Sequence, residues 1–487
     1  MSGRATLPAV TDVDPSSAAR PASDAPAMSP EDLVRLTGGH LLARAERPIR
    51  GGAVDSREVT PGALFVALPG ERTDGHDHLA DAVRRGATAV LVTRPPADAS
   101  ALGDVTVVRV ADGVAALGAV ASDWRRRFDP LVVGITGSIA KTSTKEAAAA
   151  VLAADRPTLR TEGNRNNEIG LPLTLLRLGP EHAAAVLEMG MYVGGEIADL
   201  AAMARPSIGV ITAIQPVHLS RIGSLEAVEQ AKGELLEALP GNGVAILNAD
   251  DPIVDRMDRR TAARAMRYGF SSEADVVAED IDSLGAAGMR FRLRTPSGSR
   301  GVAIPGLGRL SVHNAAAGAA VGIAAGVRLD TIVAGLAAGW SAAHRVTLVR
   351  LRGATVIDDS YNASPASMRA SLEVLAGMPG RRVAVLGTML ELGEEHDSGH
   401  LAVGRAAAHV AELLIVTGHE ARGIAEGALE AGLASQRVLV VADADAALDA
   451  LRPRLREGDA VLVKASRGIE LDRVVDGLRL ELGESAS

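Results

Sequence analysis

The sequence predicts an α/β protein of about three domains. The chain has 487 residues, and a length of roughly 150 residues per domain allows three. From Val105 onward, apolar segments of strand character alternate with helical segments, which is typical of parallel sheets covered by helices. Several apolar segments end in polar residues, and parallel α/β sheets bind ligands at the carboxyl ends of their strands. We therefore expect the functional residues along such an edge.

Ordered structure is expected to begin at Ser29. Residues 1–28 are rich in Ala, Pro, Ser and Asp and lack an apolar signal core, so we interpret them as a disordered tail and not as a targeting segment. Ser29 is followed by Pro30 and two acidic residues, which is typical of a capped helix start, and Gly38-Gly39 would end this helix.

A small α/β domain is expected over residues 29–100. Two short strands flank polar turns, and a helix at residues 78–85 and a strand at residues 89–92 follow. The segment at residues 95–100, Pro-Pro-Ala-Asp-Ala-Ser, has the composition of a linker and would end this domain.

The most informative motif lies at residues 131–146, where an apolar segment enters a turn of small residues and an Ala-rich helical segment follows. The turn and the helix start comprise Thr136, Gly137, Ser138, Ile139, Ala140, Lys141, Thr142 and Ser143. A phosphate there would meet backbone N–H groups at the positive end of a helix dipole, with Lys141 on the terminal phosphate and the Thr142 hydroxyl on Mg²⁺. The motif predicts an ATP site, although an ordinary glycine-containing turn into a core helix is the alternative.

Ala140 disagrees with this motif, because a loop of this type normally has glycine before its lysine. Ile135 likewise occupies the place of the first glycine. Glycine allows a positive φ and a close approach to phosphates without steric cost. Because the first residue of a helix avoids a positive φ, we predict helical backbone angles for Ala140, with Lys141 remaining the phosphate ligand.

Three further polar residues are candidates in the central part. Glu188 ends an apolar segment at residues 185–187 and could hold Mg²⁺, or it could be a strand-end acid facing water. His218 lies in a predicted loop, where a lone histidine is more often structural or exposed. Lys232 lies in a helical segment and, from its residues alone, would be one more solvated lysine.

A second parallel α/β domain is expected beyond a boundary near residues 339–343. The central ATP-binding domain would occupy residues 101–343, with a β-rich part at residues 271–311, and a Rossmann-like domain would occupy residues 344–487. Its strands are expected at residues 346–349, 355–357, 383–386, 413–416, 438–441 and 460–463.

Composition narrows the function classes. With 51 Lys and Arg against 60 Asp and Glu, the net charge of -9 argues against nucleic-acid and anionic-membrane partners. The nine aromatic residues offer few platforms for stacking bases. The chain has no cysteine, which excludes disulfides and a cysteine nucleophile and fits a cytoplasmic location. No apolar run approaches the roughly 18 residues that a membrane span needs. We expect the chain to be a monomer.

In order and spacing, these motifs resemble those of the Mur ligases of peptidoglycan synthesis, from about residue 33 to 480. The N-terminal part has Asp55-Ser56-Arg57 and Asp74-Gly75-His76, and the centre has Gly163-Asn164, Asn166-Asn167 and His313-Asn314 besides the motifs above. The C-terminal part has Arg345, Asp358-Asp359-Ser360-Tyr361-Asn362-Ala363, Met389-Leu390-Glu391-Leu392-Gly393, and Lys464 with Ser466-Arg467.

The resemblance implies a three-domain fold: a small α/β domain for the UDP-substrate, a central ATPase domain with a phosphate loop and a parallel sheet, and a Rossmann-like domain. It also implies an ATP-dependent amide ligase, most similar to the branch that adds D-alanyl-D-alanine to UDP-N-acetylmuramoyl-tripeptide through an acyl-phosphate. Both substrates are small molecules.

The resemblance also implies residue roles. The nucleotide would be held by residues 136–143 with Asn314, Arg345, Asp359 and Tyr361. The UDP-substrate would be held by Ser56, Arg57, Asp74, Gly75, His76, Asn164, Asn166, Asn167 and Asn362. Mg²⁺ would be held by Thr142, Glu188, His218 and Lys232, the lysine as a carbamate, and Lys141, Glu188, His218 and Lys232 would be the catalytic set.

Several positions depart from the family pattern. Ala140 and Ala465 replace glycines, while Ala213, Gln215 and Ser220 replace an asparagine, a glycine and an acid near the expected metal and substrate site. The alternatives are therefore a Mur-like ligase with another carboxylate or amine substrate, and a nucleotide-binding relative with reduced activity.

Overall fold

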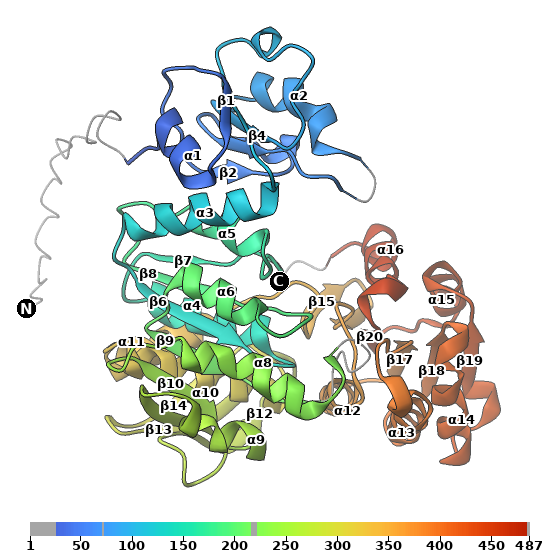
Figure 1. Cartoon of the computed structure of the whole chain (residues 1–487). Coiled ribbons are helices and arrows are strands. Elements are labelled where there is room, and N and C mark those ends of the chain that lie inside the picture. The colour runs from blue at the N-terminus through green and yellow to red at the C-terminus, as the bar shows by residue number, and fades with distance from the viewer. Residues whose placement is uncertain (1–25, 71–72, 216–221, 485–487) are drawn as a thin grey trace, which may run out of the picture.

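Three α/β domains follow one another along the chain in the computed structural model, which describes residues 26–70, 73–215 and 222–484. The N-terminal domain lies on the central domain through α3, and the C-terminal domain lies beside the central domain (Figure 1). The predicted fold class is confirmed. No helix in the described part of the chain is long and apolar enough to cross a bilayer.

The N-terminal domain contains a five-stranded sheet in the order β1-β5-β4-β3-β2, parallel except for the β1–β5 pair. Its elements are α1 (Pro30–Thr37), β1 (His40–Ala43), β2 (Gly52–Ala53), β3 (Leu64–Val66), α2 (Leu79–Arg84), β4 (Ala89–Val92) and β5 (Thr106–Arg109). Helix α1 begins as predicted, because the Ser29 hydroxyl accepts a hydrogen bond from the Asp32 N–H and the Asp32 carboxylate accepts one from the Ser29 N–H. Gly38 ends α1 with a φ of 62°.

Two predicted boundaries of this domain are wrong. Met28, assigned to the tail, is buried and pairs with Ile49 through two backbone hydrogen bonds, because its side chain fills the apolar core. The earlier residues 1–25 lie outside the described part of the chain. The Pro-rich segment at residues 95–100 connects β4 to β5 within one sheet, so the domain extends beyond residue 100.

The central domain is built on a nine-stranded sheet in the order β14-β13-β12-β11-β10-β9-β6-β8-β7. Its strands are β6 (Leu131–Thr136), β7 (Thr158–Arg160), β8 (Ala184–Glu188), β9 (Ile208–Ile211), β10 (Val244–Asn248), β11 (Arg264–Gly269), β12 (Val276–Ser283), β13 (Met289–Thr295) and β14 (Gly298–Ile304). Strands β6 to β12 are parallel to one another. Strand β13 is antiparallel to both of its neighbours, β12 and β14, in the part expected to be β-rich. Its helices are α3 (Gly113–Arg126), α4 (Lys141–Ala153), α5 (Gly170–Leu175), α6 (Glu196–Ala204), α8 (Leu225–Glu237), α9 (Pro252–Asp255), α10 (Gly308–Ala324) and α11 (Leu329–Ala338).

The C-terminal domain has a six-stranded sheet in the order β15-β16-β20-β17-β18-β19, in which only β15 is antiparallel. Its strands are β15 (Thr347–Leu351), β16 (Ala354–Asp358), β17 (Arg382–Gly387), β18 (Leu413–Thr417), β19 (Val438–Val441) and β20 (Asp459–Lys464), close to their predicted positions. The helices α12 (Pro365–Ala376), α13 (His396–Ala408), α14 (Arg422–Glu430), α15 (Ala444–Leu451) and α16 (Asp472–Leu482) cover its faces.

The apolar cores join the first two domains more closely than the last two. One cluster of buried residues runs from Leu33 and Val108 in the N-terminal domain through Trp124 of α3 to Val132 and Leu187 in the central sheet. The C-terminal domain has two clusters of its own, one on each face of its sheet. A contiguous core therefore fixes the first junction, and the second junction is open to ligands.

Candidate active site

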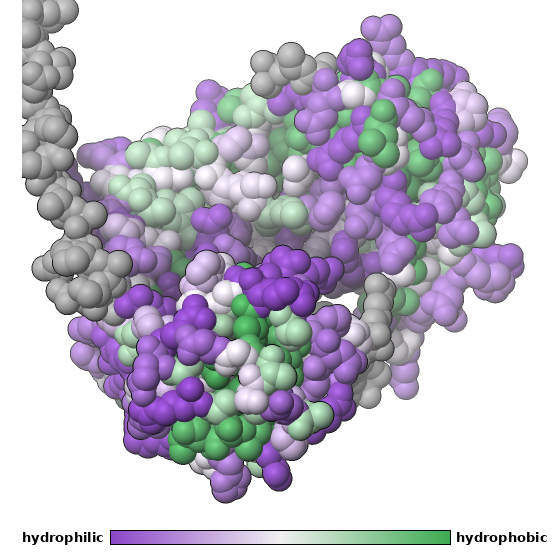
Figure 2. All heavy atoms as spheres, turned by 90° about the horizontal axis from the view of Figure 1, so that it is seen from above, coloured by the Kyte–Doolittle hydropathy of each residue, from purple (hydrophilic) through white to green (hydrophobic). Residues whose placement is uncertain are grey.

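A cavity of about 1310 Å³ lies between the central and C-terminal domains. The phosphate-loop segment before α4 lines one side, and the loops that follow β16, β17 and β20 line the other. Seen from above, the molecular surface is hollowed between its lobes, with hydrophilic side chains along much of the rim (Figure 2). The cavity lies at carboxyl ends of parallel strands, as the sequence predicts.

The loop between β6 and α4 is attached to the segment that follows β9. The Ser138 N–H donates to the Ala213 carbonyl (2.8 Å), and the Thr212 hydroxyl donates to the Ile139 carbonyl (2.6 Å). The Ser138 hydroxyl accepts from the Gln215 N–H (2.9 Å). Gly137 has a φ of 147°, and a Cβ there would collide with the Thr212 hydroxyl, so this position requires glycine.

The predicted helical angles for Ala140 are wrong. Ala140 is the N-cap of α4 and has φ 65° and ψ 0°, in the left-handed region. The residue lies before the helix and turns the chain into it, and its carbonyl accepts the first intrahelical hydrogen bond, from the Thr144 N–H (2.9 Å). Since left-handed angles cost an L-residue on the order of 1 kcal/mol, Ala140 occupies this position under strain.

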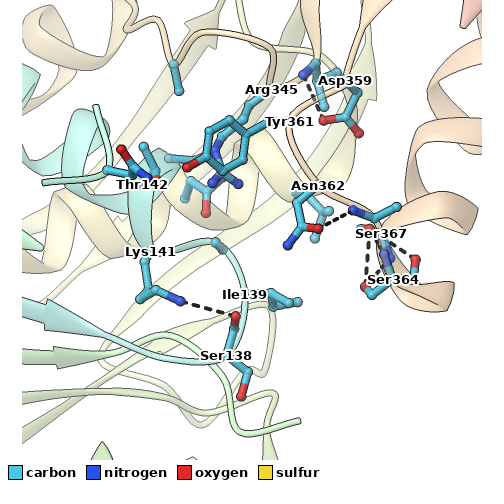
Figure 3. Close-up of a pocket in the computed structure, with 18 of the residues that line it drawn as sticks. Ser138, Ile139, Lys141, Thr142, Arg345, Asp359, Tyr361, Asn362, Ser364 and Ser367 are labelled. Carbon is cyan, nitrogen blue, oxygen red and sulfur yellow. Dashed lines mark hydrogen bonds between the residues drawn. The ribbon is translucent and has the colours of Figure 1, made fainter. Parts of the chain in front are cut away.

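Lys141 and Thr142 open helix α4 and face the cavity (Figure 3). The Lys141 ammonium donates to the carbonyls of Gly137 (2.7 Å) and Ser138 (3.3 Å), which holds it within the loop. Burial lowers the pKa of Lys141, with a smaller lowering from Arg345, while the Glu188 carboxylate opposes the change. The loop thus presents a cation and a hydroxyl to an anionic ligand.

Glu188 ends β8 inside the molecule and does not face water, since it is 1% exposed. Its Oε1 accepts a hydrogen bond from the Asn166 amide (2.8 Å), and its Oε2 has no hydrogen-bond partner among the residues that the structure describes. Gly190 permits this arrangement, because a Cβ there would fall 2.9 Å from the Asn166 Cγ. A buried carboxylate oxygen without a partner fits a cation ligand such as Mg²⁺.

Lys232 is not the solvated lysine that its residue type suggests, since it is 3% exposed. Burial, and then the charge of Lys141, hold the pKa of Lys232 well below its usual value. His218 and Ser220 lie outside the described residues, and their predicted placement is not tested. Within the described ranges, no group of three or more His, Cys, Asp or Glu residues is arranged to hold a metal.

The C-terminal domain contributes an arginine–tyrosine stack. The Arg345 guanidinium lies 4.2 Å from the centre of the Tyr361 ring and the Arg467 guanidinium 5.9 Å from it. Figure 3 shows the Tyr361 ring between Arg345 and Thr142, so the stack faces the phosphate loop across the cavity. Asn362 lies beside it and lines the same cavity.

Asp359 lines the cavity but is held within its own domain. Its Oδ2 accepts from the Lys464 ammonium and the Ser371 hydroxyl (both 2.5 Å), and its Oδ1 accepts from the Val346 N–H (3.2 Å). A nucleotide contact by Asp359 would have to be shared with these donors.

Asn314 belongs to a second polar group below the loop. Its Oδ1 accepts from the Thr144 hydroxyl (3.2 Å). The neighbouring His313 Nε2 lies 3.1 Å from Asn248 Oδ1 and 3.2 Å from Asp250 Oδ2. Sequence reasoning missed Asn248 and Asp250. Asn248 ends the apolar strand β10 as Glu188 ends β8, and Asp250 follows two residues later, so the same strand-end rule would have found them.

The predicted substrate residues fall into two groups. Asn164, Asn166 and Asn167 line the cavity. Ser56, Arg57, Asp74, Gly75 and His76 lie in the N-terminal domain and do not line it. Arg57 is paired with Asp55, and its hydrogen bond is the largest cause that lowers the pKa of Asp55 to about 2. An ion pair between Arg165 and Glu58 (2.6 Å) connects the two groups.

Comparison with known proteins identifies the family. Three family models match the chain: "Mur ligase family, catalytic domain" at residues 48–125, "Mur ligase middle domain" at residues 135–322, and "Mur ligase, glutamate ligase domain" at residues 344–467. The UDP-N-acetylmuramoyl-tripeptide–D-alanyl-D-alanine ligase of Mycobacterium tuberculosis (strain ATCC 25618 / H37Rv) is 40% identical over 463 residues, which cover 87% of this chain and 91% of that protein.

Two solved structures have the same fold. MurF from Acinetobacter baumannii superposes with a TM-score of 0.83 at 31% identity, covering 94% of this chain and 100% of that one. MurF from Thermotoga maritima, solved in complex with ADP, has a TM-score of 0.76 at 30% identity and covers 89% of this chain and 98% of that one. With the family models and the relatives in agreement over nearly the whole chain, this protein belongs to the Mur ligase family.

Proposed function

We propose that this chain is an ATP-dependent ligase that joins D-alanyl-D-alanine to UDP-N-acetylmuramoyl-tripeptide. The observation that carries the proposal is one cavity that contains the Lys141 ammonium, the carboxylate of buried Glu188 and the Arg345–Tyr361 stack. Within the described ranges, Oε2 of this carboxylate has no hydrogen-bond partner. The relatives named for this reaction, at about 40% identity, support the choice of substrates.

The first chemical step brings two anions together. The terminal carboxylate of the tripeptide attacks the γ-phosphorus of ATP, a P–O bond forms, and ADP leaves. Lys141 stabilises the charge that builds up on the transferred phosphoryl group, from a half-buried position at the cavity wall where its field is less screened than in open water. Mg²⁺, when bound by Thr142, Glu188, Lys232 and His218, would further offset the repulsion between the anions.

The second step forms the amide. The amine of D-alanyl-D-alanine attacks the acyl-phosphate carbonyl, the tetrahedral intermediate expels phosphate, and the nitrogen loses a proton. The asparagine amides of Asn164, Asn166 and Asn167 at the cavity wall provide hydrogen-bonding groups that would orient the peptide end. Ser56, Arg57, Asp74, Gly75, His76 and Asn362 would hold the rest of the UDP-substrate.

The nucleotide would lie between the two domains. Residues 136–143 and Asn314 come from the central domain, and Arg345, Asp359 and Tyr361 come from the C-terminal domain. The ADP complex of the Thermotoga maritima protein supports this class of ligand. Because the site is split between two domains, their closure on ATP would complete it.

Lys232 would act as a carbamate. A plain ammonium beside Mg²⁺ and Lys141 would be repelled, whereas carbamylation turns the amine into a carboxylate-like ligand. The burial and lowered pKa of Lys232 favour the neutral amine that this modification needs. Replacing Lys232 by alanine should then be partly rescued by short carboxylic acids, and an unmodified lysine in an active crystal would contradict the assignment.

Incubation of the full chain with ATP, Mg²⁺, UDP-N-acetylmuramoyl-tripeptide and D-alanyl-D-alanine, followed by mass spectrometry, tests the function. We expect the UDP-muramoyl-pentapeptide together with ADP and phosphate. If a product forms only with other amines or carboxylates, the chain is a ligase with different substrates. If the chain binds ATP but shows no substrate-stimulated release of ADP, it is a nucleotide-binding protein and not an enzyme. We place the reaction in the cytoplasm, which fits a chain without cysteine.

A further inference from the structure

The lysines of this chain have an unusual distribution. Of its 51 lysine and arginine residues only four are lysines, namely Lys141, Lys145, Lys232 and Lys464. Lys145 has no exposed surface, Lys464 is 2% exposed and Lys232 is 3% exposed. Lys141 is half-buried, so none of the four lysines is fully exposed, whereas many arginines of the described ranges are. Lys141 and Lys464 line the cavity.

The proposed chemistry uses Lys141 and Lys232 and leaves the other two without a role. A buried ammonium loses its hydration and persists only where protein groups replace it. The contacts of Lys145 and Lys464 therefore show what each one holds in place.

Lys145 lies one turn after Lys141 on α4. Its ammonium donates to the carbonyls of Thr161 (2.6 Å) and Gly163 (3.5 Å) and forms an ion pair with Glu146 (2.7 Å). Both carbonyls belong to the chain that leaves β7 and leads to the cavity-lining asparagines. Lys145 therefore ties this segment to the helix that carries the phosphate loop.

The segment held by Lys145 frames Glu188. The Thr161 hydroxyl accepts a hydrogen bond from the Glu188 N–H (3.1 Å), and the Asn166 amide donates to Glu188 Oε1 (2.8 Å). Lys145 reaches the carboxylate only through these residues, and it touches neither the phosphate loop nor the C-terminal domain in the contacts above.

Lys464 holds the opposite wall of the cavity. Its ammonium donates to Asp359 Oδ2 (2.5 Å) and to the Asn362 carbonyl (2.8 Å). These two residues bracket Tyr361, whose ring stacks on Arg345. Lys464 therefore fixes both ends of the short segment that presents the stack.

Arginine would not serve at either position. The ammonium is a compact charge with three rotatable donors, whereas the guanidinium is a wide planar group. Lys145 and Lys464 direct their donors to acceptors on different residues within nearly closed surroundings. This explains why lysine is kept here in a chain that uses arginine elsewhere.

We propose that Lys145 and Lys464 are positioning residues with separate tasks: Lys145 sets the wall of the cavity that receives the UDP-substrate, and Lys464 sets the wall that receives the nucleotide. The inference rests on the proposed function for the identity of the two ligands. It predicts that the same substitution, lysine to methionine, raises the KM for the UDP-substrate at position 145 and the KM for ATP at position 464.

The test compares Lys145→Met and Lys464→Met, which remove the charge and keep the chain length. In Lys145→Met we expect the KM for UDP-N-acetylmuramoyl-tripeptide to rise about tenfold or more and the KM for ATP to stay within about threefold. In Lys464→Met we expect the reverse. Arg405→Met, which removes a cation from an exposed pair with Glu430 on the C-terminal surface, is the control and should change neither.

Two further variants cover the case in which a methionine variant does not fold. Thr161→Val removes the acceptor next to Glu188 and should raise the KM for the UDP-substrate selectively, and Ser371→Ala removes a donor to Asp359 and should raise the KM for ATP selectively. Calorimetric titration with ADP gives a readout that needs no ligase activity. The Kd for ADP should rise about tenfold in Lys464→Met or Ser371→Ala and stay unchanged in Lys145→Met or Thr161→Val.

The positioning roles and the proposed ligase function fail through different results. Equal effects of both lysine substitutions on both KM values, or equal ADP affinities across all variants, would overturn the positioning roles. A wild-type chain that binds ADP but forms no amide would overturn the proposed function, while a selective loss of ADP affinity in Lys464→Met would still support its nucleotide role.

Discussion

The two junctions between domains differ in the kind of side chain that forms them. Between the N-terminal and central domains, one apolar cluster is continuous, and Trp124 lies buried within it with its indole N–H donating to the Leu178 carbonyl (3.0 Å). Between the central and C-terminal domains lies a cavity lined by charged and polar side chains, among them buried Glu188 and Lys464. The first junction is thus a core, and the second is a site.

Most of the non-glycine residues with a positive φ lie at or beside the cavity. Seven non-glycine residues of the described part have a positive φ, and none precedes Ala140. Ala140, Val346 and Glu391 line the cavity, and His344 lies next to its wall. Val346, with φ 50°, is the sharpest case because a β-branched residue rarely adopts this region. Strain of this kind persists where the surroundings impose it and clusters at functional sites.

One interface holds two domains in a fixed arrangement, and the other interface contains the proposed active site. An apolar junction fixes the N-terminal domain, with its proposed UDP-substrate residues, relative to the phosphate loop. The polar junction contains the cavity in which we place the ATP site. Changes at the first junction should therefore alter stability, and changes at the second should alter catalysis.

Lys141→Ala is expected to have the largest effect. It removes the ammonium held by the Gly137 carbonyl in the loop before α4, the group to which we assign the stabilisation of the transferred phosphoryl group. Ligation should fall by about 1,000-fold or more, measured as pentapeptide product by mass spectrometry, while the thermal unfolding midpoint stays close to that of the wild type. Normal ATP-dependent turnover in this variant would mean that the loop is not the phosphate site.

Trp124→Ala is expected to destabilise the chain by about 3 kcal/mol or more, because it leaves a large cavity in the shared core and an unpaired Leu178 carbonyl. Urea unfolding checks the loss. The KM for ATP of the remaining folded protein should change little, since the cavity between the other two domains does not include Trp124. A selective rise in this KM without loss of stability would break the proposed division between the junctions.

Arg345→Lys tests the open junction with the charge retained. The planar guanidinium stacks on Tyr361, and an ammonium cannot reproduce this stack. We expect the KM for ATP to rise about fivefold, the equivalent of ~1 kcal/mol for a cation–π contact. Steady-state kinetics at saturating UDP-substrate measure it. Arg309, whose guanidinium lies 4.6 Å from the Phe270 ring, also borders the cavity, so Arg309→Lys distinguishes this stack from general loss of arginine.

Sequence alone predicted the architecture well, because periodic apolar segments report which faces are buried. The strands of the C-terminal sheet were found within a few residues, and the placement of Glu188 at a strand end is confirmed. The roles assigned to the site residues remain proposals.

The errors share a physical cause: composition does not report three-dimensional neighbours. A proline pair suggested a linker where β5 returns to the first sheet, and a tail residue, Met28, fills a core whose other members lie far along the chain. The backbone angle of Ala140 depends on how the chain enters α4, and the contacts of Lys145 depend on a segment that begins 16 residues later. A local sequence pattern predicts neither the backbone angle of Ala140 nor the contacts of Lys145.

The smallest expected effect, at Ala140, follows from two opposing free energies. Relief of the left-handed alanine by Ala140→Gly would stabilise the folded chain by about 1–2 kcal/mol. Glycine also has more conformational freedom in the unfolded chain, and this offsets about 0.5–1 kcal/mol of the stabilisation. The net gain in the free energy of unfolding should be about 0.5 kcal/mol, and the affinity for ATP should change by less than about tenfold.

The other end of the same helix provides a matched control. Ala154 caps the C-terminus of α4 with φ -69° and ψ -17°, where alanine is unstrained. Ala154→Gly should therefore destabilise the chain by about 0.5–1 kcal/mol, since only the unfolded-state term remains. Urea unfolding of both variants measures the two changes in the free energy of unfolding, which should have opposite signs. The transition to follow is the one that added ADP shifts to a higher urea concentration. Destabilisation of both variants to the same extent would show that Ala140 carries no strain, and that the loop tolerates alanine for another reason.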